Sequence, residues 1–168
     1  PYGTISIYGG DILIANAADA VNPLTFTVNA EKTANYDVDI NETNIVTSGP
    51  KTTALINLTG YSPTFSGSIQ VLDGADFTLN ARGRISGYSI NVTGPTTDRP
   101  HLSGTVIASG GGTAEINATD AQDDQTYIAR PGGTVRVNLQ GASVQGTRFA
   151  YDTKTLVYGE NSVFEENI

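Results

Sequence analysis

This chain of 168 residues lacks, or nearly lacks, several residue types that carry common protein chemistry. It has no cysteine, which excludes disulfide bonds, thiol catalysis and thiolate metal sites. It has one histidine, His101, so a three-histidine metal site is impossible, and no serine lies in a Gly-X-Ser-X-Gly elbow. Tryptophan, a common platform for sugars, is also absent. We therefore expect a protein that is not an enzyme.

Charged residues are scarce and mostly acidic. They make up 15% of the chain, well below the roughly 25% of an average protein. Nine basic residues stand against seventeen acidic ones, which gives a net charge of -8. Phosphate binding needs clustered Lys and Arg, and only Arg82 and Arg84 form a close pair, so nucleic acid is not expected as a partner. No apolar run approaches the roughly 20 residues that span a bilayer, and we expect no membrane span.

Short segments in which apolar and polar residues alternate recur along the whole chain. Examples are "TISIY" (4–8), "TALINL" (53–58) and "TVRVNL" (134–139), separated by turn residues such as those in "SGP", "LDGAD" and "RPGG". A period of two places alternate side chains on opposite faces of a strand. The pattern therefore predicts an all-β domain with one buried and one solvated face. Val135, Val137 and Leu139 share the apolar face and are predicted to line the core or an acceptor groove.

The spacing of these segments distinguishes two all-β architectures. A β-solenoid stacks similar rungs and should repeat at a fixed step, but the apolar anchors of successive segments show no constant step. Irregular short strands joined by turns are typical of a sandwich. We therefore predict an antiparallel β-sandwich or jelly roll, with a β-solenoid or a trimeric intertwined β-fold as the alternative. Residues 1–10 are expected to form an N-terminal strand and glycine hinge, and residues 11–168 a single β domain.

The acidic, Thr-, Asn- and Gly-rich pattern resembles the β-sandwich subunits of prokaryotic extracellular filaments, including archaeal threads and bundling pili. That resemblance implies assembly by donor-strand exchange, in which one subunit's strand completes the sheet of its neighbour. In "GTISIYGG", Ile5 and Ile7 would be the donated side chains and Gly9 and Gly10 the hinge. Such head-to-tail contacts do not close, so they give a fibre built from copies of the chain. The alternative is that "TISIY" is the first strand of its own sheet.

A second resemblance is carried by two longer stretches, "GSIQVLDGADFTLNARGRISGYSINVTG" and "GGTVRVNLQGASVQGT". They resemble the rungs of phage tailspike and autotransporter β-helices. This resemblance implies a different function, that of a virion surface protein of a phage or archaeal virus. Such a protein would be a capsid decoration, head fibre or tailspike segment that binds surface glycans. The expected location is accordingly extracellular, at the cell surface or at the virion surface.

Two kinds of surface site are also open from the sequence. Asp120, Asp123 and Asp124 in "ATDAQDD" are candidate calcium ligands, because calcium takes six to eight oxygens and often binds in loops. The alternative for this cluster is a solvated loop.

Four Asn-X-Ser/Thr triplets permit N-linked glycosylation. With Thr and Ser this common, several such triplets are expected by chance. They begin at Asn41, Asn57, Asn91 and Asn117.

Overall fold

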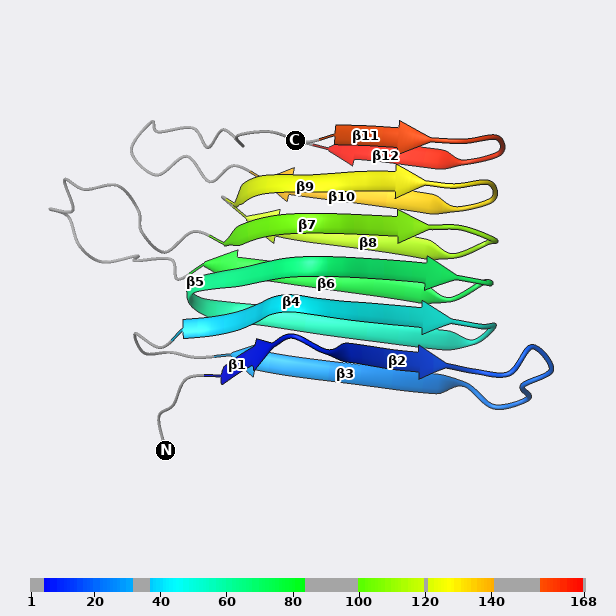
Figure 1. Cartoon of the computed structure of the whole chain (residues 1–168), viewed down its shortest axis with the longest axis horizontal. Helices are drawn as coiled ribbons and strands as arrows, with labels where there is room; N and C mark the ends of the chain where they lie inside the picture. Colours follow the sequence, from blue (N-terminus) through cyan, green and yellow to red (C-terminus); the bar gives the residue numbers. More distant parts are fainter. Residues whose placement is uncertain (1–4, 32–36, 84–99, 120, 141–154, 168) are drawn as a thin grey trace, which may run out of the picture.

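The chain forms a stack of β-strands, with no helix in the ranges that the structure describes (Figure 1). The computed structural model describes residues 5–31, 37–83, 100–119, 121–140 and 155–167. The strands are β1 (Ile5–Tyr8), β2 (Asp11–Ala15), β3 (Leu24–Glu31), β4 (Asp37–Ser48), β5 (Thr52–Leu72), β6 (Asp76–Gly83), β7 (His101–Ala108), β8 (Thr113–Thr119), β9 (Gln122–Ala129), β10 (Thr134–Gln140), β11 (Thr155–Tyr158) and β12 (Val163–Asn167).

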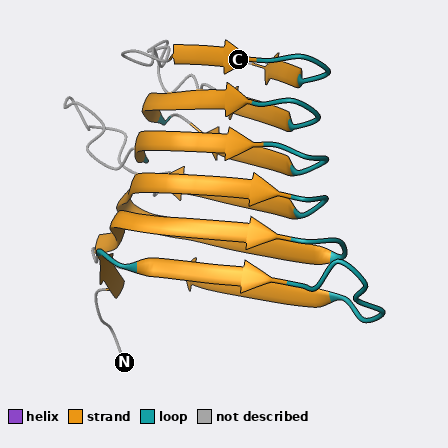
Figure 2. Ribbon diagram, turned by 45° about the vertical axis from the view of Figure 1, so that its right-hand side comes forward, coloured by secondary structure: helices purple, strands orange, loops and turns teal. Residues whose placement is uncertain are grey.

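Every pairing between the described strands is parallel. Sheet A contains β1, β2, β4, the second half of β5, β7, β9 and β11, and sheet B contains β3, the first half of β5, β6, β8, β10 and β12. The chain runs along sheet A, turns, and runs back along sheet B before it starts the next rung (Figure 2). The predicted antiparallel sandwich or jelly roll is therefore wrong. The fold is a β-solenoid, the alternative that the sequence left open.

The prediction failed because the rungs differ in length. Along sheet B, Thr53 lies beside Asp76, Asp76 beside Thr113, and Thr113 beside Thr134. These register partners are 23, 37 and 21 residues apart in sequence. The turns from sheet A to sheet B are short in the middle of the stack. The sequence distance between register partners therefore varies mainly with the segments that lead from sheet B back to sheet A. Segment 84–99, which lies outside the described residues, falls within the longest step.

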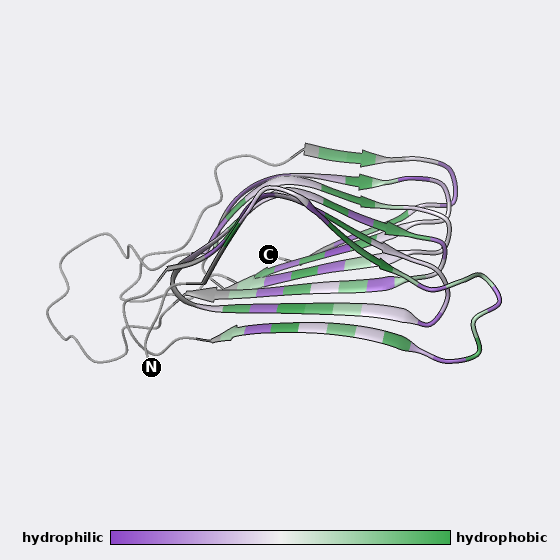
Figure 3. Cartoon of the chain, turned by 60° about the horizontal axis from the view of Figure 1, so that its bottom comes forward, coloured by the Kyte–Doolittle hydropathy of each residue, from purple (hydrophilic) through white to green (hydrophobic). Residues whose placement is uncertain are grey.

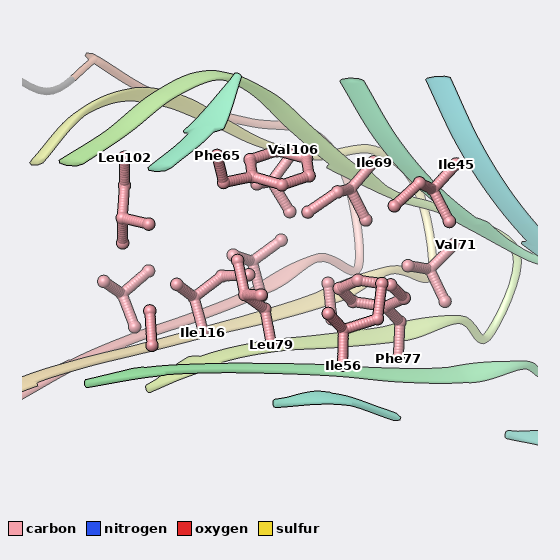
Figure 4. Close-up of a cluster of buried hydrophobic side chains, with 14 of the residues drawn as sticks. Ile45, Ile56, Phe65, Ile69, Val71, Phe77, Leu79, Leu102, Val106 and Ile116 are labelled. Atoms are coloured by element: carbon pink, nitrogen blue, oxygen red, sulfur yellow. The ribbon is translucent and has the colours of Figure 1, made fainter. Parts of the chain in front are cut away.

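The core lies between the two sheets and is built from columns of apolar side chains. Ile45, Ile69 and Val106 of sheet A stack on one another and are 0% exposed. They face the column of Ile56, Leu79 and Ile116 of sheet B (Figure 4). The outward positions of sheet B carry mostly Thr and Asn, and hydrophobic and hydrophilic residues alternate along its strands (Figure 3). Parallel strands are thus covered by the opposite sheet on one face only, which explains the clean alternation in the sequence.

The predicted core residues Val135, Val137 and Leu139 lie in β10 with their side chains in this interior. All three are at most 1% exposed. They therefore belong to the core of the chain itself, and within the described residues no open acceptor groove runs beside them.

Sheet A arches where two glycines stack, whereas sheet B is nearly straight (Figure 3). Gly67 in β5 and Gly104 in β7 have φ angles of +124° and +121°. Residues other than glycine rarely adopt such φ angles. A Cβ on Gly104 would lie 2.2 Å from the carbonyl oxygen of Gly67, closer than any real contact. Each glycine is thus required at its own position, because the backbone of the neighbouring strand lies too close for a side chain.

This column gives a direct test of the stacked arrangement. We expect Gly104→Ala to lower the free energy of unfolding by at least about 3 kcal/mol, because it combines an unfavourable φ with a backbone clash. The measurement is urea unfolding followed by circular dichroism. Gly10→Ala is the matched control, since Gly10 has a φ of +87° and no atom within 4 Å of an added Cβ. It should lose only about 1 kcal/mol, and equal losses for the two variants would contradict the stacking.

Candidate assembly interface

A row of asparagines crosses the outer face of sheet B from rung to rung. Their side chains are joined by one hydrogen bond between each pair of neighbouring strands, with N–O distances of 2.7 to 2.9 Å. In every bond the amide Nδ2 donates to the Oδ1 of the preceding rung, so the row has a direction. We call this the asparagine ladder, and its members are Asn29, Asn57, Asn80, Asn117 and Asn138.

The two ends of the ladder differ chemically. At the N-terminal end, Asn29 accepts from Asn57, and its own Nδ2 donates to no group in the described part of the chain. At the C-terminal end, Asn167 occupies the next register position beside Asn138. The ladder therefore leaves an amide donor at one end of the solenoid, and at the other end its last bond joins Asn138 to Asn117.

Sequence reasoning missed the ladder, although a signal for it exists. The phrase in which an apolar residue, Asn, and Ala or Leu follow one another occurs as "VNA", "INL", "LNA", "INA" and "VNL". Each asparagine holds the same place in its strand. The repeated phrase, rather than a fixed step, marks the rungs.

The ladder predicts a graded loss of stability. Asn80 takes part in two ladder bonds and Asn29 in one. With about 1 kcal/mol for each bond, we expect Asn80→Ala to destabilise the fold by about 2 kcal/mol and Asn29→Ala by about 1 kcal/mol. Chemical unfolding of both variants measures this. A larger loss for Asn29→Ala would show that the ladder does not act as a chain of bonds.

The N-terminal edge of the stack exposes unpaired backbone. The N–H of Leu24 donates to the carbonyl of Lys51 in the neighbouring rung. Because successive residues of a strand point their N–H and C=O groups in opposite directions, the groups of Thr25, Thr27 and Asn29 point away from the stack. Within the residues that the structure describes, no strand pairs with this edge of β3.

The C-terminal edge is open in the same way. The N–H of Val163 donates to the carbonyl of Gly133, so the N–H groups of Phe164 and Glu166 point outward. As far as the described ranges extend, no strand pairs with the outer edges of β11 and β12. An unpaired strand edge is a template for another strand.

Apolar side chains accompany both open edges. At the N-terminal end, Phe26 and Val28 are only partly buried, and Leu24 is 36% exposed. At the C-terminal end, Leu156 and Phe164 are partly buried. Their counterparts in the middle rungs are completely covered. Each end of the solenoid thus leaves part of its apolar core exposed.

The predicted N-terminal assembly strand pairs within its own chain. Ile5 and Ile7 lie in β1, opposite Val38 and Ile40 of β4, and Ile7 packs against the core. Gly9 and Gly10 follow with positive φ angles and lead directly into β2. Because the sandwich is absent, the acceptor groove expected for a donated strand has no counterpart in the described residues.

The acidic cluster predicted as a calcium site is divided by the strand alternation. Asp123 and Asp124 lie in β9, where Asp123 is completely buried and Asp124 is exposed. Asp120 lies outside the described residues. Among those that are described, no group of three potential metal-ligating side chains occurs.

Asp123 belongs to a polar network inside the solenoid. The hydroxyl of Tyr127 donates to Asp123 Oδ2 at 3.0 Å, and Gln125 Nε2 donates to that hydroxyl at 3.0 Å. The backbone N–H of Gln125 also donates to Asp123 Oδ1 at 3.2 Å. All three side chains are 0% exposed. A buried network of this kind fixes one arrangement of the core, because any broken bond leaves a polar group without water.

Removal of the central hydroxyl tests the network. We expect Tyr127→Phe to destabilise the fold by about 1 to 3 kcal/mol, since it removes the buried hydrogen bonds of the hydroxyl to Asp123 and Gln125. Tyr8→Phe is the control, because Tyr8 is 67% exposed, and it should change stability by less than about 0.5 kcal/mol. Thermal unfolding compares the two. Equal midpoints would contradict a structural role for the hydroxyl.

The glycosylation triplets fall at different places. The Nδ2 atoms of Asn57 and Asn117 already donate in the asparagine ladder, so a glycan on either nitrogen would break a ladder bond. Asn41 is half-buried and its Oδ1 accepts from the Ser66 hydroxyl. Asn91 lies outside the described residues.

Comparison with protein-family models, with curated proteins and with solved structures gives no match for this chain. The candidate site therefore depends on its geometry alone. Within the described ranges, no helix is long and apolar enough to cross a membrane.

Proposed function

We propose that this chain is a non-enzymatic structural subunit that adds end to end to copies of itself and forms an extracellular fibre. The observation that supports this proposal is the pair of open edges. Each carries unpaired backbone groups and a partly covered section of the apolar core. A second copy placed on either end would continue the stack by backbone pairing, the same interaction that joins the rungs within one chain.

The two edges are suited to each other. All strands within a sheet run in the same direction, so the N-terminal edge of one copy can pair in parallel with the C-terminal edge of another. In that arrangement the free amide donor of Asn29 would face the register position of Asn167. Phe26 and Val28 of one copy would cover the exposed core of the other. The contact joins two different surfaces, so it repeats without closing.

A second candidate is a rung segment of a virion appendage. The observation that favours it is the stack of parallel rungs, which is what the resemblance to tailspike β-helices implied. Such a segment need not polymerise when purified. Negative-stain microscopy separates the two candidates, because the fibre subunit gives long filaments and the appendage segment gives discrete particles.

A proline in the N-terminal edge tests the end-to-end contact. Thr27 is exposed, and its N–H points away from β5, so Thr27→Pro removes a donor that the chain itself does not use. Proline is tolerated at such a position in an edge strand. We expect the variant to fold with nearly the parent melting temperature and to form no filaments, as observed by sedimentation and microscopy.

Thr27→Val is the matched control, because it retains the N–H and adds a β-branched side chain that suits a strand. It should form filaments as the parent does. Filaments from Thr27→Pro that match those of the parent would disprove the contact, as would a parent chain that stays monomeric at every concentration tested.

A further inference from the structure

The outer face of sheet A carries a row of apolar side chains that the solenoid core does not use. The register places these residues beside one another in successive strands, with Gln70 of β5 in the middle of the row. Their strand neighbours on the other side, such as Ile45, Val106 and Tyr127, fill the core. We call this set the apolar row, and its members are Leu13, Val46, Ile107, Ile128 and Val157.

The apolar row is accessible along its whole length. Leu13 is 70% exposed at one end and Val157 is 47% exposed at the other. Val46, Ile107 and Ile128 between them are half-buried by their neighbours in the row. Apolar residues gathered in one row, interrupted here by Gln70, mark a contact site more often than scattered apolar residues do.

The surface around the apolar row carries few charges. The adjacent outward row contains Asp11, Asn44, Ser68, Thr105 and Thr126, and Asp124 is exposed at the next outward position of β9. The outer face of sheet B differs, because its corresponding rows carry charged residues in four strands. These residues are Asp76, Glu115, Arg136 and Glu165.

We propose that the outer face of sheet A binds the same face of a second copy of this chain. The net charge of -8 makes copies repel one another, and the apolar row is where two copies can meet along a line that contains no carboxylate. A charged partner would lose hydration there without gaining an opposite charge. The chain's own face supplies the neutral, apolar counterpart that such a surface needs.

The size of the face suits a stable contact. Six strands of sheet A contribute to it, and the longer ones, such as β7, have 8 residues. At about 4.8 Å between strands and about 3.3 Å per residue, the face measures roughly 29 by 26 Å, or about 750 Å². A standard interface covers about 800 Å² on each partner.

The straight row also fits two-fold symmetry. A two-fold axis parallel to the apolar row, between two facing copies, places the row of one copy on the row of the other. The same patch then serves both partners, as in most dimers. The two solenoids lie side by side and their end edges stay open, so the contact is independent of the end-to-end assembly.

A charge in the middle of the row tests the contact. In the Thr27→Pro chain, whose filaments are expected to be blocked, we expect a dimer by sedimentation velocity and light scattering. Adding Ile107→Glu should weaken dimerisation by at least about tenfold, equivalent to about 1.4 kcal/mol. The matched control is Leu55→Glu, a half-buried apolar residue on the outer face of sheet B beside Thr78. It should leave the dimer intact.

A milder variant guards against loss of folding. Ile107→Thr combined with Ile128→Thr retains β-branched side chains and should also weaken the dimer, with the far-ultraviolet dichroism of the parent. A Thr27→Pro chain that is monomeric throughout, or a Leu55→Glu variant that weakens the dimer as much as Ile107→Glu, would overturn the lateral contact while leaving the end-to-end proposal intact.

If Thr27→Pro still forms filaments, the end-to-end proposal fails and the lateral contact is read from filament width. Narrower filaments from Ile107→Glu, but not from Leu55→Glu, would then support it. Equal widths would overturn it.

Discussion

The structure depends on parallel backbone pairing in which each residue lies directly beside its counterpart in the next rung. A shift of one residue would exchange the inner and outer faces of a strand. The register is therefore fixed by burial, since Leu79 must stack on Ile56 and Ile116 on Leu79. The glycine column, the asparagine ladder and the apolar row all follow from this one constraint. Each is a column of residues that the register brings together from distant parts of the sequence.

The sequence allowed the faces of the strands to be predicted, but not the way the strands pair. Alternation correctly placed Val135, Val137 and Leu139 on an inner face, because that pattern depends only on the geometry of one strand. The pairing could not be read from spacing, because the segments that return to sheet A vary in length between rungs. The geometry of the stack limits the lengths of the strands and of the short turns. A segment that leads back to sheet A can be longer without disturbing the stack. The recurrent asparagine phrase is less affected, since Asn80 and Asn117 mark equivalent places although they are 37 residues apart in sequence.

The interior of β9 shows a second limit of sequence reasoning. Three polar residues, Asp123, Gln125 and Tyr127, alternate with outward residues and point into the core. Three acidic residues within five positions are typical of loops, so the sequence indicated a calcium-binding or solvated loop here. Burial of such a group depends on hydrogen-bond partners, and two of these are the backbone N–H of Gln125 and the hydroxyl of Tyr127, two and four positions away. Strand alternation therefore predicts that Asp123 and Asp124 point apart, once the segment is known to be a strand.

The two surfaces proposed for assembly use different chemistry, and this difference sets how far each contact can extend. In the proposed assembly, the end edges would associate through backbone groups, and the contact could repeat because each added copy presents a new edge. The lateral face would associate through side chains, and it would be fully covered once two copies meet. The outer face of sheet B then remains exposed, with Glu115, Arg136 and the ion pair between Arg136 and Glu165 (2.6 Å) on it. That ion pair is exposed and adds little stability, but charges on this face oppose the stacking of a further copy. In the proposed assembly, this charge distribution would favour paired fibres over wider sheets.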